Sequence, residues 1–140
     1  MQKPRILIVD DDASLRTALF RSLERNGYQV ITATCGTEAE SLVQGNHKVD
    51  LALIDLRLPD GDGIELMQKI RGTSPSTQAI ILTGFGSIEI AVEATQKGAY
   101  HFITKPFNLD EILSIVNKAL SHSQLEQENQ QLKSALKGKI

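Results

Sequence analysis

Five polar residues stand where short apolar runs of the sequence end, and their types suit phosphoryl-transfer chemistry. Asp10 and Asp11 follow the first such run, and Asp55 ends a later one. Thr83 and Lys105 close two more. A carboxylate is ionised at neutral pH, so Asp55 would attack phosphorus without a general base. If the fold brings them beside Asp55, the ammonium group of Lys105 would neutralise charge on the phosphoryl oxygens, and the hydroxyl of Thr83 would donate a hydrogen bond to one of them.

The three carboxylates also predict a site for Mg²⁺. Carboxylates held close together repel one another, and without compensation one of them would take up a proton. A hard divalent cation relieves that repulsion, and Mg²⁺ prefers oxygen ligands. Zinc is not expected, because the candidate nitrogen and sulfur ligands are scattered along the chain: Cys35, His47, His101 and His122.

The elements that must position these residues alternate along the chain. Apolar runs predict strands over residues 5–9, 28–33, 50–55, 78–83 and 100–103. Amphipathic segments predict helices over 12–25, 37–44, 63–71 and 87–97, and from Asn108 onward, with Asp12, Ser87 and Asn108 placed to cap three of them. Five strand–helix units predict an α/β fold in which helices cover both faces of a doubly wound parallel sheet.

Two strand orders suit such a chain, the dinucleotide-binding order and the flavodoxin-like order 2-1-3-4-5. The first turn of the sequence is acidic, Asp10 to Asp12, and it would repel a pyrophosphate. We therefore expect the flavodoxin-like order. In that order strands 1, 3, 4 and 5 are neighbours, so all five polar residues should meet at one edge of the sheet, beside the switch point. A single Asp at a strand end usually only caps a helix, so the evidence lies in the joint placement.

The composition excludes several other classes of protein. The chain has 140 residues, 41% hydrophobic and 23% charged, with a net charge of −2, which suits one globular domain with a short extension. Its basic residues are scattered, so nucleic-acid binding by this segment is not expected. The start of the chain does not resemble a signal peptide, and the apolar runs are too short to cross a bilayer. We expect a cytoplasmic protein without a membrane segment.

The last twenty residues are polar and carry a weak heptad pattern. Leu125, Asn129, Leu132 and Leu136 fit alternating a and d positions of a short coiled coil. A solvated helical tail is the alternative, and fewer than three heptads leave both open.

Four stretches of the sequence resemble the receiver domain of two-component response regulators, the CheY-like family. They are ILIVDDD (6–12), LALIDLRLPDGDG (51–63), ILTGFGS (81–87) and GAYHFITKPF (98–107), in the order and spacing of that family. The resemblance covers about residues 5–120. It implies that Asp55 is the phosphoacceptor, that Asp11 binds Mg²⁺ directly, and that Asp10 binds it directly or through water. The backbone carbonyl of Arg57 would be a further ligand.

The same resemblance implies roles for residues of the later strands. Thr83 and Lys105 would contact the phosphoryl group, and the Lys105–Pro106 bond would be cis. Phe102 occupies the aromatic switch position, where a phenylalanine lacks the hydroxyl of the frequent tyrosine. Two glycines suit the loop after the acceptor, where backbone freedom is needed: Gly61 and Gly63.

The stretch TGFGSIEIAVEATQKGAYHFITKPF (83–107) resembles one branch of the family, the NtrC-type activators that act with the sigma-54 factor. That branch implies a sensor histidine kinase as phosphoryl donor, homodimerisation, and ATPase and DNA-binding domains in the full-length protein. The chain has no GxxxxGK[ST] loop. We therefore expect an N-terminal fragment, with a receiver over residues 1–120 and a helical linker over 121–140. Such a receiver catalyses only its own phosphorylation and dephosphorylation, so it is not expected to be an enzyme acting on other substrates.

Three other functions compete with this hypothesis. A stand-alone phosphorelay carrier would not need the helical tail. A binding module that is never phosphorylated would be expected to lack one of the polar residues, but all are present. A phosphatase that forms an aspartyl intermediate usually has a second Asp two residues after the nucleophile, where this chain has Arg57.

Overall fold

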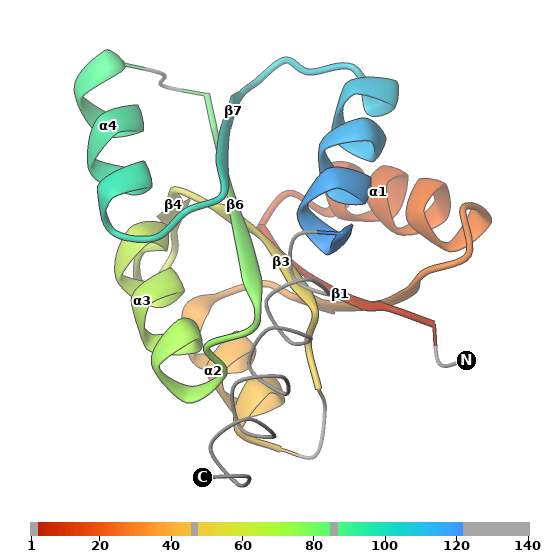
Figure 1. Cartoon of the computed structure of the whole chain (residues 1–140), viewed down its shortest axis with the longest axis horizontal. Coiled ribbons are helices and arrows are strands. Elements are labelled where there is room, and N and C mark those ends of the chain that lie inside the picture. The colour runs from red at the N-terminus through yellow and green to blue at the C-terminus, as the bar shows by residue number, and fades with distance from the viewer. Residues whose placement is uncertain (1–2, 46–47, 85–86, 122–140) are drawn as a thin grey trace, which may run out of the picture.

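A central parallel sheet lies between two layers of helices (Figure 1). The computed structural model describes residues 3–45, 48–84 and 87–121. The five strands of the sheet are, in spatial order, β2 (Gln29–Ala33), β1 (Arg5–Val9), β3 (Leu51–Asp55), β6 (Gln78–Thr83) and β7 (His101–Thr104). All neighbouring pairs run parallel. Counted along the chain, this is the order 2-1-3-4-5, so the predicted flavodoxin-like fold is confirmed.

Helices cover both faces of the sheet. On one face, α1 (Ala13–Arg25) lies beside the C-terminal helix, whose described part is residues 109–121 (Figure 1). The other face carries α2 (Gly36–Gln44), α3 (Gly63–Thr73) and α4 (Ile88–Gln96). Each strand therefore packs against helices above and below, as strands of a buried parallel sheet must.

The two faces of the sheet explain why the strands are almost wholly apolar. In β1, Ile6 and Ile8 pack toward α1 and the C-terminal helix, whereas Leu7 and Val9 pack toward α2 and α3. The same alternation continues in β3 and β6, because successive side chains of a strand point to opposite faces. The sequence pattern of short apolar runs follows from this double burial.

Three predicted helix caps are confirmed. The side chain of Asp12 accepts a hydrogen bond from the backbone N–H of Leu15 at 3.2 Å, and Ser87 accepts one from Ile90 at 3.1 Å. Asn108 accepts one from Asp110 at 2.7 Å. Each satisfies a backbone donor that the first turn of a helix leaves without a partner, which fixes where the helix begins.

One element was not predicted. Residues 57–62 form a small antiparallel hairpin of β4 (Arg57–Leu58) and β5 (Gly61–Asp62), directly after the third strand of the main sheet. Gly61 lies in this hairpin with a φ of 157°, a conformation that L side chains rarely adopt, so the expected need for backbone freedom is confirmed there.

In the part of the chain that the structure describes, no helix is both long and apolar enough to cross a membrane. The predicted heptad positions Leu125, Asn129, Leu132 and Leu136 lie outside the described residues, as do His47 and His122.

Candidate phosphoryl-transfer and metal site

The register of the sheet brings the predicted site residues to one edge. Val9 pairs with Ile54, so the next residues, Asp10 and Asp55, lie side by side at the carboxyl ends of β1 and β3. One step along, β6 ends at Thr83, which pairs with Thr104 of β7. Lys105 follows immediately, and its backbone N–H donates to the carbonyl of Thr83 at 2.7 Å.

Three carboxylates form a cluster at this edge. Oxygen atoms of Asp10, Asp11 and Asp55 all lie within 4.8 Å of one another. Asp10 is fully buried and Asp55 is 9% exposed, whereas Asp11 is open to solvent. The cluster therefore has two buried members and one at its mouth, which leaves an approach from solvent.

The backbone N–H, the backbone carbonyl and the side chain of the buried Asp10 are all hydrogen-bonded. Its backbone N–H donates to the carbonyl of Ala33 at 3.2 Å, and its Oδ1 accepts from the N–H of Asp12 at 2.9 Å. Its own carbonyl accepts from Nη1 of Arg16 at 2.7 Å. Sequence reasoning missed Arg16, because nothing in the local sequence distinguishes this bond from a solvated arginine on the first turn of a helix.

Lys105 links two of the carboxylates. Its Nζ lies 2.9 Å from Oδ2 of Asp10 and 3.6 Å from Oδ2 of Asp55. The prediction that Lys105 reaches the acidic edge is thus met in geometry.

Thr83 and Phe102 lie on the paired strands β6 and β7, next to the cluster. Thr83 is 1% exposed at the end of β6. Phe102 is partly buried on β7, opposite Ile81, and packs on the side of the sheet that α2, α3 and α4 cover. The Lys105–Pro106 peptide bond is cis, as predicted.

Burial and neighbouring charges shift the pKa values of Asp55 and Lys105. Burial raises the pKa of the Asp55 carboxyl above its usual 3.8, and the charge of Asp10 raises it further. The charge of Lys105 and the hydrogen bond from the N–H of Arg57 lower it by less than this, and the charge of Asp11 adds a last, small increase. Burial lowers the pKa of Lys105, but the hydrogen bond and charge of Asp10, followed by the charge of Asp55, raise it by more. The folded chain therefore holds Asp55 in surroundings that disfavour its ionised form.

A comparison with known families decides the class of protein. The model of the response regulator receiver domain family matches residues 6–117. This chain belongs to that family. The receiver is 41% identical over 118 residues to the transcriptional regulatory protein GlrR of Escherichia coli, and 35% identical over 128 residues to the DNA-binding transcriptional regulator NtrC of Salmonella typhimurium. These alignments cover 84% and 91% of the chain but only 26% and 27% of the relatives, so the chain spans about a quarter of their length.

A solved structure supports both the fold and the family. A response regulator protein from Burkholderia pseudomallei, determined with a phosphorylated aspartic acid, a calcium ion and citrate, aligns with a TM-score of 0.77 and 33% identity. The match covers 89% of the receiver and 73% of that chain.

The donor set of the receiver's cluster fits Mg²⁺. Asp10, Asp11 and Asp55 offer carboxylate oxygens within reach of one ion, and oxygen is the ligand that Mg²⁺ prefers. Lys105 supplies one positive charge against the three carboxylates, so it neutralises them only in part. Burial first, and then the charge of Asp10, raise the pKa of Asp55, and a divalent cation at the cluster would favour the ionised carboxylate against both effects.

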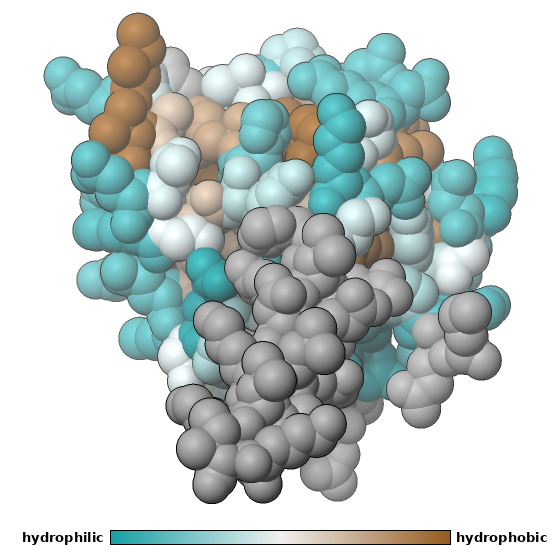
Figure 2. Space-filling view, in the orientation of Figure 1, coloured by the Kyte–Doolittle hydropathy of each residue, from teal (hydrophilic) through white to brown (hydrophobic). Residues whose placement is uncertain are grey.

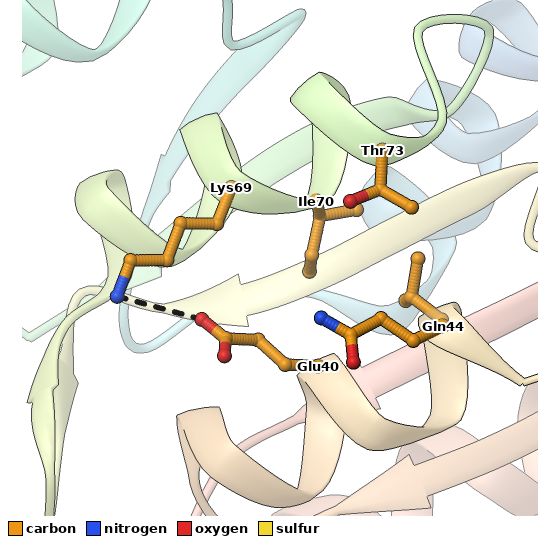
Figure 3. Close-up of a pocket in the computed structure, with 6 residues that line it drawn as sticks. Glu40, Gln44, Lys69, Ile70 and Thr73 are labelled. Atoms are coloured by element: carbon orange, nitrogen blue, oxygen red, sulfur yellow. Dashed lines mark ion pairs between the residues drawn. The ribbon is translucent and has the colours of Figure 1, made fainter.

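Two hollows in the described part of the receiver lie apart from this cluster. One, of about 250 Å³, is a hollow open to solvent between α2 and α3, where Glu40 and Lys69 form an ion pair of 3.5 Å (Figure 3). Another, of about 450 Å³, lies between the β4–β5 hairpin, α3 and α4. The residues that line these two hollows do not include any of the three carboxylates.

Proposed function

We propose that this receiver accepts a phosphoryl group on Asp55 from the phosphohistidine of a sensor histidine kinase in the cytoplasm. The observation that carries the proposal is the group of three carboxylates within 4.8 Å of one another, with Lys105 at 2.9 Å from Asp10 and 3.6 Å from Asp55. The family match and the phosphorylated aspartic acid of the Burkholderia pseudomallei protein support it.

The chemistry would need little from the protein beyond position and charge. An oxygen of the ionised Asp55 attacks phosphorus, the phosphorus–nitrogen bond breaks, and the donor imidazole leaves with a proton. Lys105 neutralises charge on the transferred group, and the hydroxyl of Thr83 donates to one of its oxygens. Asp10, Asp11, Asp55 and the carbonyl of Arg57 would hold Mg²⁺, which when bound adds further neutralising charge.

We further propose that phosphorylation alters the face formed by α4, β7 and the C-terminal helix. Thr83 would move toward the phosphoryl group and Phe102 would turn inward, which shifts a two-state equilibrium. This face carries the exposed apolar residues Ile88, Val92 and Leu109, and Figure 2 shows hydrophobic surface over α4. In the full-length protein the change would control dimerisation and, through the linker of residues 121–140, an ATPase and a DNA-binding domain of the sigma-54-dependent type.

The acceptor chemistry is tested by intact-protein mass after incubation with acetyl phosphate. We expect the added mass of one phosphoryl group on the wild type with Mg²⁺ present, and none when EDTA removes the metal. Asp55→Asn should gain nothing. Asp110→Asn, the same change at an exposed carboxylate of the C-terminal helix, should still accept one group. No addition to the wild type, with Mg²⁺ shown to bind, would favour an unphosphorylated binding module.

The altered face is tested by light scattering with and without acetyl phosphate. We expect the molar mass of the chain to change on phosphorylation, because burial of exposed apolar surface drives association. Ile88 is 84% exposed, so Ile88→Ser should weaken the association without disturbing the core. An unchanged mass in the fully phosphorylated wild type would contradict the dimer proposal and leave the acceptor chemistry standing.

A further inference from the structure

The start of α2 has no cap from its own segment. Its N-cap residue is Cys35, whose side chain makes no capping hydrogen bond. A thiol is a weak acceptor, and the residues that usually cap helices carry side-chain oxygens. The N–H groups of the first turn are therefore left to water or to a partner from elsewhere in the chain.

Asp60 supplies that partner from a distant loop. Its Oδ1 accepts from the N–H of Gly36 at 2.8 Å, and its Oδ2 accepts from the N–H and the hydroxyl of Thr37 at 2.9 and 2.8 Å. These three hydrogen bonds lower the pKa of Asp60 to about 2, so the carboxylate is ionised at any physiological pH. A Cβ at position 36 would lie 3.2 Å from Oδ1, so a glycine there leaves room for the contact.

Asp60 stands at the turn of the hairpin that follows the phosphoacceptor. The hairpin begins at Arg57, whose N–H donates to Oδ1 of Asp55 at 3.4 Å, and it ends at Asp62, which caps α3. The segment that precedes α2 also contacts the carboxylate cluster. Strand β2, which precedes α2, ends at Ala33, and the carbonyl of Ala33 accepts the backbone N–H of Asp10. Asp60 thus joins the loop after Asp55 to the structure that holds Asp10.

We propose that Asp60 is a positioning residue for the metal site: by fastening the tip of the β4–β5 hairpin to the N-terminus of α2, it fixes the backbone of Arg57 beside Asp55. This inference rests on the proposed function, in which the Arg57 carbonyl and Asp55 bind Mg²⁺. The alternative is that Asp60 only stabilises α2 as a cap. The two roles are separable, because a cap from Cys35 itself would replace the second role and not the first.

Three variants separate the roles: Asp60→Ala, Cys35→Ser, and the two together. Cys35 has the extended backbone of an N-cap residue, with φ of −153° and ψ of 172°, so a serine there would offer α2 a local cap without adding charge. Cys35→Ser alone controls for that change. Asp60→Asn, which keeps one acceptor oxygen, takes the place of Asp60→Ala if the alanine variant does not fold.

Each variant is measured for urea unfolding, for Mg²⁺ affinity by calorimetry without a phosphoryl donor, and for hydrogen exchange of the amides of residues 57–62. We expect Asp60→Ala to lower stability and weaken Mg²⁺ binding about tenfold, the lower end of the effect of removing an outer-shell partner. Those amides should exchange faster. In the double variant, stability should return toward that of the wild type, whereas Mg²⁺ affinity and exchange should remain as in Asp60→Ala.

Recovery of Mg²⁺ affinity in the double variant would show that Asp60 is only a cap and would overturn the positioning role. So would an unchanged affinity in Asp60→Ala. A wild type that binds no Mg²⁺ in the same titration is a different result, because it would overturn the proposed function and this inference together.

Discussion

Replacing Asp55 with Asn should stabilise the metal-free chain at neutral pH and abolish its stabilisation by Mg²⁺. Asp55 is buried beside Asp10, and both burial and that neighbouring charge raise its pKa. At neutral pH the ionised carboxylate therefore costs the folded state free energy, which the uncharged amide does not. We expect a gain in the free energy of unfolding of the size that single substitutions commonly have, on the order of 1 kcal/mol.

The pH dependence of this gain follows from the direction of the shift. A raised pKa means that the folded chain binds this proton more tightly than the unfolded chain does. The stability that protonated Asp55 contributes is fully present below the unfolded pKa, near 3.8, and is lost as the pH rises through the higher folded pKa. The advantage of Asp55→Asn over the wild type should accordingly grow across that interval and then stay constant up to neutral pH.

Magnesium should reverse the ranking of the two proteins. At one hundred times its dissociation constant, a ligand that binds only the folded state stabilises it by about 2.7 kcal/mol. The wild type should show this gain, and Asp55→Asn, which lacks one carboxylate of the cluster, should show little of it. Urea unfolding in EDTA and in excess Mg²⁺ measures both quantities.

Asp60→Asn is the matched control for this prediction, because the pKa of that carboxyl is lowered and not raised. The same chemical change there should destabilise the metal-free chain. Metal-free Asp55→Asn that is no more stable than the wild type would show that Lys105 already compensates the cluster.

The residues that sequence analysis placed correctly owe their positions to local signals. Apolar runs gave the strands, and polar residues at run ends, such as Asp10 and Asp55, gave the site once a parallel order was assumed. The parallel register then leaves little freedom: when Val9 pairs with Ile54, the two following aspartates must be neighbours. Caps such as Asp12 and Ser87 were predictable for the same reason, because a cap and its helix are adjacent in the chain.

The features that were missed depend on contacts between distant segments. Asp60 caps a helix that begins 24 residues before it, and Arg16 bonds a backbone carbonyl whose position is set by the sheet. The only local sign of the first contact is negative: α2 begins after a cysteine, which is a poor cap. Helix starts without a capping residue therefore mark places where a partner from another segment should be sought.

The expectation that Gly63 provides backbone freedom was wrong, and the structure gives another reason for a glycine there. The sequence suggested that this glycine gives the loop backbone freedom, but it is the first residue of α3 and does not have a positive φ. The reason is proximity. A Cβ there would lie 2.9 Å from the carbonyl carbon of Asp55 and from Cα of Leu56, and closer still to the carbonyl oxygen of Asp55. The backbone N–H of Gly63 also donates to the carbonyl of Leu56 at 2.7 Å.

Gly63→Ala should therefore destabilise the chain and damage the site together. The methyl group meets backbone and not a flexible side chain, so either α3 or the end of β3 must move. We expect a loss of about 3 kcal/mol in the free energy of unfolding, the upper part of the usual range for overpacking. Displacement of Asp55 by about 1 Å should also slow its phosphorylation by acetyl phosphate about 100-fold.

Gly72→Ala is the matched control for the Gly63 variant. Gly72 lies in the same helix, and a Cβ there would meet nothing within 4 Å. Alanine has a higher helix propensity than glycine, so this change should stabilise the chain by roughly 0.5–1 kcal/mol. It should leave the phosphorylation rate unaltered. Opposite signs for two identical substitutions in one helix would establish that the contact of Gly63 with the backbone of Asp55 holds the phosphoacceptor in place. A Gly63→Ala variant as stable and as readily phosphorylated as the wild type would instead show that the two segments can separate without cost, and that the close approach has no part in the chemistry.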